Sequence, residues 1–187
     1  MYVTRVALLG DGAVGKTAIR RRYMGEGFVI NYQATIGADF ASKNTIIDGE
    51  EFSFQIWDLA GQPLYTNVRR IYYQGCMGGF AVYDCTRRST YENIMNWVYD
   101  LWQYCGKGKV PVVLLGNKFD LMEETPNAIT IEEGNILTNK LSDQMETSDF
   151  PVQFYPTSAK TGLNIDEAFN VLGRLIVAFF KKKQNDS

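Results

Sequence analysis

Histidine does not occur in this chain of 187 residues. Because its imidazole is the group most often used for proton transfer near neutral pH, any chemistry here must depend on other side chains. Cysteine is scarce, and the three present, Cys76, Cys85 and Cys105, form no C-x-x-C pair. Without paired spacing or histidine partners they indicate neither a zinc site nor a disulfide framework, so we expect reduced thiols.

Strong net charge and long apolar runs are also missing. The formal net charge is −2, with acidic and basic residues interspersed, so the chain offers no general attraction to a nucleic-acid backbone. No apolar run approaches the ~18 residues of a membrane-spanning helix. The first residues, MYVTRVALLG, contain neither a long enough apolar run for a signal peptide nor a small-residue cleavage site. We therefore expect a cytoplasmic protein that binds no nucleic acid and has no transmembrane segment.

Segments with strand character alternate with segments of helical spacing. Expected strands are 2–10, 52–56, 79–84, 110–117 and 152–157, and expected helices are 17–24, 89–104, 130–145 and 165–180. Asp48-Gly49 joins a strand-like run at 40–47 to the run at 51–57, which predicts a hairpin with an antiparallel edge strand. This order predicts an α/β fold, with a mostly parallel six-stranded sheet and helices on both faces. No linker composition is found, so we expect one domain over 1–180 and a short basic tail over 181–187.

A phosphate-binding motif follows the first expected strand. The sequence from Gly10 to Thr17, GDGAVGKT, fits G-x-x-x-x-G-K-[ST] and leads into a helix, as this motif requires. Its glycines let successive backbone N–H groups point at phosphate oxygens, while Lys16 supplies a charge at the β- and γ-phosphates and Thr17 a hydroxyl for Mg²⁺. The expected phosphate-binding residues are Gly12, Ala13, Val14, Gly15, Lys16 and Thr17. The motif predicts a P-loop NTPase but does not identify the base.

Two later motifs indicate guanine. Asn117-Lys118-Phe119-Asp120 follows a buried strand, at the end where open α/β sheets bind ligands. A carboxylate at Asp120 matches the N1–H and 2-amino donors of guanine, whereas adenine would present an acceptor. Asn117 can tie the base to neighbouring loops. After the last strand come Ser158, Ala159 and Lys160, where the Ala159 N–H can bond the guanine O6, and the stems of Lys118 and Lys160 can cover the two faces of the ring.

In this order, the motifs GDGAVGKT, YQATIGADF, WDLAGQ, NKFD and TSAK resemble those of the Ras superfamily of small GTPases, most closely its Rab branch. The resemblance covers nearly the whole chain. It implies that Phe28 flanks the guanine edge-on, that Thr35 is a second Mg²⁺ ligand in the triphosphate state, and that Asp58 holds Mg²⁺ through water. It also implies exchange factors, GTPase-activating proteins and effectors as partners of a monomer.

Gln62, in the stretch WDLAGQPLY, is the expected catalytic residue. Its amide can orient a water toward the γ-phosphate. Phosphoryl transfer needs no strong general base, because positioning of the water and stabilisation of charge supply most of the catalysis. The Gly61 N–H is expected to bind the same phosphate. Because no arginine occurs among the motifs to stabilise charge on the transferred phosphoryl group, we expect a switch that hydrolyses GTP slowly until a partner inserts an arginine. Pro63 restricts the backbone of Gln62, which either preorganises that residue or holds it away from the water.

Two other functions are compatible with these motifs. One is a binding module that holds guanine nucleotide without turnover, which Pro63 favours and which Gly12 and Gln62 disfavour. The other is a P-loop kinase with a small acceptor, which leaves NKFD unexplained and lacks an arginine-rich lid segment. Release of phosphate with and without an added acceptor would separate all three.

Several departures from Rab-like sequences concern partners and location. Leu59, Pro63 and Leu64 stand where Thr, Glu and Arg are usual, and the interval from Asn117 to Ser158 is longer than usual, around EETPNAIT and DQMETSDF. An effector surface of Phe40, Trp57 and Tyr72 is expected by resemblance, with ordinary packing under the switch loops as the alternative.

The sequence ends in KKKQNDS rather than in prenylated cysteines. Either it is truncated or the protein lacks the lipid. Three lysines alone are too weak an anchor, so peripheral membrane association would require a second signal, and the alternative is that they form a solvated helix end.

Overall fold

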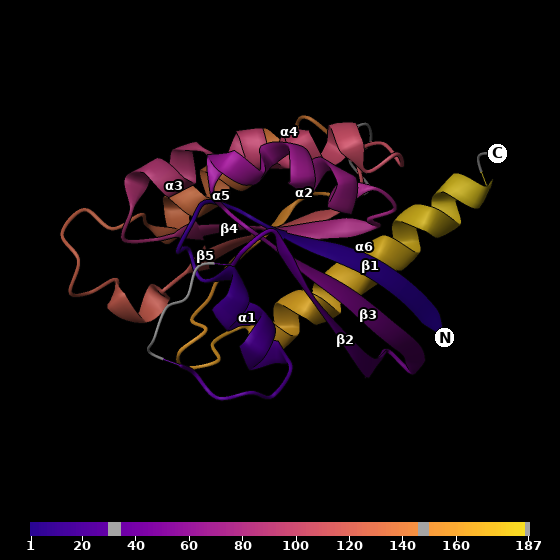
Figure 1. Ribbon diagram of the computed structural model, residues 1–187, viewed down its shortest axis with the longest axis horizontal. Helices are drawn as coiled ribbons and strands as arrows, with labels where there is room; N and C mark the ends of the chain where they lie inside the picture. Colours follow the sequence, from indigo (N-terminus) through magenta and orange to yellow (C-terminus); the bar gives the residue numbers. More distant parts are fainter. Residues whose placement is uncertain (30–34, 146–149, 186–187) are drawn as a thin grey trace.

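The computed structural model describes residues 1–29, 35–145 and 150–185, and within them the chain forms a six-stranded sheet in the order β2-β3-β1-β4-β5-β6 (Figure 1). The strands are β1 (Tyr2–Leu9), β2 (Ala38–Ile47), β3 (Glu50–Leu59), β4 (Gly78–Asp84), β5 (Val112–Asn117) and β6 (Gln153–Pro156). Neighbouring strands run parallel, except that β2 pairs with β3 in antiparallel register. The α/β class and the antiparallel edge strand are therefore confirmed.

The hairpin between β2 and β3 turns at Asp48 and Gly49. Both residues have positive φ angles, 51° and 82°, as a two-residue turn of this hand requires. The Asp48 carboxylate also accepts hydrogen bonds from Arg174 of the C-terminal helix, at 2.8 and 3.1 Å. Strand register then places Phe40 directly opposite Trp57.

Helices cover both faces of the sheet (Figure 1). They are α1 (Lys16–Tyr23), α2 (Thr66–Tyr73), α3 (Arg88–Glu92), α4 (Ile94–Tyr104), α5 (Ile131–Ser142) and α6 (Ile165–Asn185), with short 3₁₀ helices η1 (Pro63–Tyr65) and η2 (Phe119–Leu121). Helices α1 and α6 lie on one face and α2 to α5 on the other. No helix among the described residues has the length and apolar character needed to span a membrane.

The helices differ from the expected ones in three places. The helix expected over 89–104 is two helices that break at Asn93, whose side chain donates to the Asp11 carboxylate at 2.7 Å. Helix α2 was not expected. Helix α6 continues past the expected end at 180 to Asn185, so the lysines at 181–183 lie on this helix.

Alternating residues of β3 build the two sides of the core. Phe52, Phe54 and Ile56 are buried against α1 and α6, while Trp57 packs on the opposite face, as its position in the strand predicts. The three cysteine thiols are free and buried.

The sheet order places several loops at one edge. Strands β3 and β4 flank β1 on opposite sides, so the chain leaves the carboxyl end of β1 at a point where the strand order reverses. In open α/β sheets this is where ligands bind. The loops that follow the parallel strands all begin at this edge; these strands are β1, β3, β4, β5 and β6. The antiparallel β2 runs the other way.

Candidate functional site

The loop between β1 and α1 wraps into an anion-binding shape. Gly10, Ala13 and Gly15 have φ angles of 136°, 61° and 101°, and the left-handed value at Ala13 is uncommon for a residue with a side chain. Backbone alternation of this kind turns successive N–H groups inward as a concave nest for anions. A Cβ atom on Gly15 would lie 2.3 Å from Asn117 Nδ2, so the loop is in close contact with the loop that follows β5.

Lys16 lies along this loop and is 6% exposed. Its Nζ donates to the carbonyl oxygens of Gly10 at 2.7 Å and Asp11 at 2.8 Å. Burial lowers the pKa of Lys16 to about 8, an effect that the carboxylates of Asp58 and Asp11 oppose. A cation in so dry a position is stabilised by any phosphate that enters the nest.

Thr17, Thr35 and Asp58 converge beside the lysine. The Thr17 hydroxyl donates to Asp58 Oδ2 at 2.6 Å and lies 3.0 Å from the Thr35 hydroxyl. Asp58 is fully buried, which raises the pKa of its carboxyl, and its Oδ1 has no hydrogen-bond partner in the described part of the chain. Two hydroxyls and an unsatisfied buried carboxylate oxygen fit a hard cation such as Mg²⁺.

Asn117 ties three loops together at the other end of the site. Its Nδ2 donates to the Val14 carbonyl at 2.8 Å, and its Oδ1 accepts from the Ala159 N–H at 3.2 Å and from the Thr157 hydroxyl at 3.4 Å. Asn117 thus connects neighbouring loops, and its contact with the base stays a prediction. The Ala159 N–H, expected to meet guanine, contacts Asn117 in this structure.

Asp120 and two lysines shape the rest of this end. The Ser158 hydroxyl donates to Asp120 Oδ1 at 2.6 Å, and the Lys160 ammonium lies 3.9 Å from Oδ2. The Lys118 ammonium extends away to Asp84, at 2.6 Å. Asp120 therefore has one oxygen oriented by Ser158 and a second that is more weakly engaged.

A cavity of about 940 Å³ joins the two ends of the site. Its lining includes the expected residues Gly12, Ala13, Gly15, Lys16, Thr17, Phe28, Thr35, Gly61, Gln62, Asn117, Lys118, Asp120, Ala159 and Lys160. Of the other expected residues, Val14, Asp58 and Ser158 are buried behind the lining and act on it through the contacts above. Tyr32 to Ala34 of the YQATIGADF motif and residues 146–149 of the longer segment lie outside the described residues.

The segment after β3 closes over the phosphate loop. A Cβ atom on Gly61 would lie 2.4 Å from the Asp11–Gly12 backbone, so only glycine fits there without displacement. The backbone carbonyl of Gln62 accepts from Arg69 Nη1 at 2.7 Å and from the Tyr65 N–H at 3.1 Å, while its side chain is exposed. Pro63 begins η1 immediately afterwards.

Three aromatic rings meet between β2, β3 and α2. The Trp57 ring centroid lies 5.1 Å from that of Phe40 and 4.9 Å from that of Tyr72, and the Arg5 guanidinium lies 4.6 Å over the indole. Phe40 is 45% exposed, whereas the Trp57 N–H is buried without a hydrogen-bond partner in the described part of the chain. The cluster is thus both packed and open to solvent on one side.

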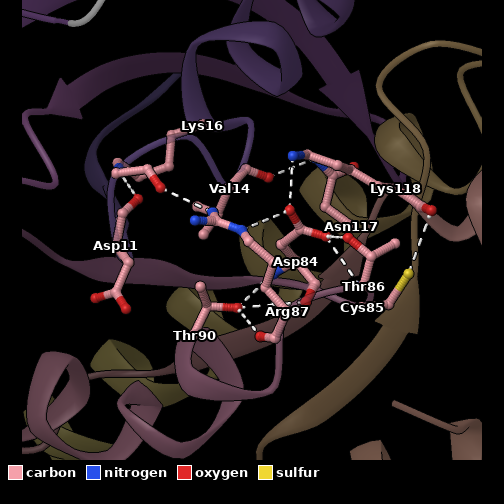
Figure 2. A network of polar contacts seen from close by, with 11 residues as sticks. Asp11, Val14, Lys16, Asp84, Cys85, Thr86, Arg87, Thr90, Asn117 and Lys118 are labelled. Atoms are coloured by element: carbon pink, nitrogen blue, oxygen red, sulfur yellow. Dashed lines mark hydrogen bonds and ion pairs between the residues drawn. The ribbon is translucent and has the colours of Figure 1, made fainter. Parts of the chain in front are cut away.

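Sequence reasoning missed the last residue of β4. Asp84 is 1% exposed and accepts from Thr86, Arg87 and Lys118, as Figure 2 shows. Its position could have indicated a role in the site, since an acidic residue at the carboxyl end of a buried strand faces the ligand-binding edge of the sheet. Arg87 lies outside every motif, and its spacing carried no signal.

Comparisons with known proteins agree with this arrangement. A family model described as Ras family matches residues 5–178. The chain is 34% identical to Rab-8 of Diplobatis ommata over 186 residues, which cover 100% of this chain and 83% of that protein. Rab-8B of Homo sapiens is 34% identical over 186 residues, covering 100% and 84%, and RABA5c of Arabidopsis thaliana is 37% identical over 186 residues, covering 100% and 81%. The chain therefore belongs to the Ras superfamily of small GTPases, in its Rab branch, and is a small GTP-binding switch protein.

Proposed function

We propose that this protein binds GTP in the cavity between the phosphate loop and Asp120 and slowly hydrolyses it to GDP and phosphate. The observation that carries the proposal is that one cavity brings together Lys16, Thr17, Gln62 and Asp120, which lie far apart in the sequence. A phosphate nest at one end and a carboxylate at the other match the two ends of a guanine nucleotide.

Each end of the cavity has its own task. The backbone N–H groups from Gly12 to Lys16 and the Lys16 ammonium bind the phosphates, and the Asp120 carboxylate accepts from N1–H and the 2-amino group of guanine. Phe28 and the stems of Lys118 and Lys160 would enclose the ring.

Thr17 and Thr35 would hold Mg²⁺, with Asp58 acting through water. When bound, the metal ion would neutralise charge on the β- and γ-phosphates.

Gln62 places the attacking water in this proposal. Its backbone is held by Arg69 and by the turn into η1, while its exposed side chain lines the cavity. A fixed backbone with a free side chain lets the amide donate and accept at a water near the γ-phosphate. No histidine is required, because positioning and charge stabilisation supply most of the catalysis in phosphoryl transfer.

Switching follows from the contacts between the loops. The Ala60 N–H donates to the Gly37 carbonyl at 2.9 Å, so the segments that follow α1 and β3 contact each other. The Thr35 hydroxyl lies 3.0 Å from that of Thr17, which places this contact at the phosphate end of the cavity. Thr35 on Mg²⁺ and the Gly61 N–H on the γ-phosphate would be held only while that phosphate is present. Hydrolysis would release both segments, and family partners would read the difference.

Replacing Gln62 by leucine tests the hydrolysis. Under single-turnover conditions with Mg²⁺, we expect Q62L to hydrolyse bound GTP roughly 10- to 100-fold more slowly because the water is no longer oriented. GTP binding should be retained, since the variant keeps the nest and Asp120. The matched control is Q74L, which changes an exposed glutamine at the end of α2. No turnover in either protein would favour the nucleotide-holding module, and equal measurable rates would show that Gln62 does not place the water.

Replacing Trp57 by alanine tests an effector surface of Phe40, Trp57 and Tyr72. We expect W57A to lose partners that bind the protein loaded with a non-hydrolysable GTP analogue but not with GDP, because the exposed side of the cluster collapses. Removing this half-buried ring should also lower the free energy of unfolding by about 2 kcal/mol. Tyr2→Ala, at the opposite end of the sheet, is the control for stability alone. Retention of those partners by W57A would identify the cluster as ordinary packing.

A further inference from the structure

Arg87 connects the phosphate loop to a buried carboxylate behind it. It follows β4, and its Nη2 donates to the Gly12 carbonyl oxygen at 2.8 Å while its Nε donates to Asp84 Oδ2 at 3.0 Å. One guanidinium thus spans two loops that are separated by more than 70 positions in the chain. Its side chain is 43% exposed, so the buried Asp84 restrains it from one side only.

Asp84 stays charged although it is buried. Burial alone would raise its pKa, but hydrogen bonds from Lys118 and from the Thr86 side chain and N–H hold the pKa below its ordinary value. The same oxygen, Oδ2, accepts from both Arg87 and Lys118, and Figure 2 shows the carboxylate between these two cations. One buried carboxylate is therefore shared by two cations beside the phosphate loop.

The hydrogen bond from Arg87 reaches the ligand side of the loop through one peptide group. The Gly12 carbonyl and the Ala13 N–H are the two ends of the same amide. Gly12 and Ala13 line the nucleotide cavity, whereas Arg87 lines a neighbouring cavity of about 720 Å³ that also reaches Gly12. A cation on the carbonyl polarises the amide and makes its N–H a stronger donor. The same bond restrains the peptide next to Ala13, whose left-handed backbone is strained.

We propose that Arg87 is a positioning residue for phosphate binding, which orients and polarises the Gly12–Ala13 peptide from behind the loop and is itself held by Asp84. This inference rests on the proposed placement of the phosphates in the nest. It applies to the β- and γ-phosphates, because the Lys16 ammonium, which reaches those phosphates in P-loops, lies at the same end of the loop on Gly10 and Asp11.

A purely structural brace would have a different effect. Through Asp84, Arg87 is also connected to Lys118, which lines the base end of the cavity. If Arg87 merely supported that end, its loss would weaken every guanine nucleotide by the same factor. If it acts through the Gly12–Ala13 peptide, the loss is confined to nucleotides that carry phosphates beyond the first.

The test compares the affinities of GMP, GDP and a non-hydrolysable GTP analogue, measured in competition with a fluorescent GDP in the presence of Mg²⁺. For R87Q we expect GDP and the GTP analogue to bind roughly three- to tenfold more weakly, with GMP within about twofold of the parent. The matched control is R88Q, since Arg88 pairs with Glu133 on α5 and does not contact the phosphate loop. Thermal unfolding with saturating GDP checks that the variants are folded.

If R87Q does not fold, R87K replaces it in the same assay. A lysine ammonium cannot bridge Gly12 and Asp84 as the guanidinium does, so a selective loss for GDP and the analogue is again expected. Equal factors for all three nucleotides, or no change for any, would overturn the role of Arg87 while leaving the proposed function intact. A parent protein that binds GMP as tightly as GDP would overturn both, because the phosphates would then not occupy the nest.

Discussion

Asp120→Asn is expected to convert a site selective for guanine into one that prefers xanthine. The carboxylate offers two acceptors, whereas asparagine offers one acceptor and one donor. Guanine presents donors at N1 and at its 2-amino group, so one of its two hydrogen bonds becomes a contact between donors. Xanthine carries an oxygen at position 2 and would find the new amide donor complementary.

The structure favours a clean exchange at this position. Ser158 donates to Asp120 Oδ1 at 2.6 Å, and an asparagine oxygen can accept the same hydrogen bond. The amide nitrogen then takes the place of Oδ2, whose contact with Lys160 at 3.9 Å is the weaker of the two. The side chain therefore keeps its orientation while its outer atom changes from acceptor to donor.

The expected loss for GDP is roughly 10- to 150-fold, because a hydrogen bond to a charged group contributes about 1.5–3 kcal/mol and one such bond is lost. Competition of GDP and xanthosine diphosphate against a fluorescent nucleotide measures both changes. Asp143→Asn, at the exposed end of α5, controls for the loss of one negative charge. An unchanged preference for GDP in D120N would show that Asp120 does not read the base.

Features set by local chemistry were predictable from the sequence. Asp48-Gly49 defined a hairpin because both residues accept positive φ angles, and Gly10 and Gly15 defined the nest for the same reason. Strand ends could be placed because buried strands end where polar residues such as Asn117 begin. These choices depend on a few neighbouring residues, so distant parts of the chain do not alter them.

Features set by contacts between distant residues were not predictable. The helix over 89–104 breaks at Asn93, whose side chain, together with the Trp97 indole N–H, donates to the Asp11 carboxylate at 2.7 Å. The apolar residues of the segment 89–104 keep their helical spacing across Asn93, so the sequence gives no sign of the break. Arg87 reaches Gly12 only because β4 and β1 are neighbours in the sheet. Such contacts require the topology, which spacing along the chain does not contain.

Asp58 is expected to determine how tightly Mg²⁺ is held. Its carboxylate is fully buried, with Oδ2 engaged by Thr17 at 2.6 Å and Oδ1 without a partner among the described residues. Burial raises the pKa of this carboxyl although the charges of Lys16 and Arg20 oppose the rise, so a further cation beside it would stabilise the charged form. Asp58→Asn keeps an acceptor for the Thr17 hydroxyl and removes the charge.

We expect D58N to bind Mg²⁺ about 10- to 100-fold more weakly, which is the usual effect of losing a group that acts on a metal through its water ligands. The measurement follows release of a fluorescent GDP as Mg²⁺ is titrated, and the midpoint should move to higher Mg²⁺ concentration in D58N. At saturating Mg²⁺ the release rate should approach that of the parent, since the nest and Asp120 are intact. Asp48→Asn, in the hairpin turn, removes a charge far from Thr17 and should leave the midpoint in place. An unchanged midpoint in D58N would mean that Asp58 serves only as a buried acceptor for Thr17, and the proposed metal site would then have to rely on Thr17 and Thr35 alone.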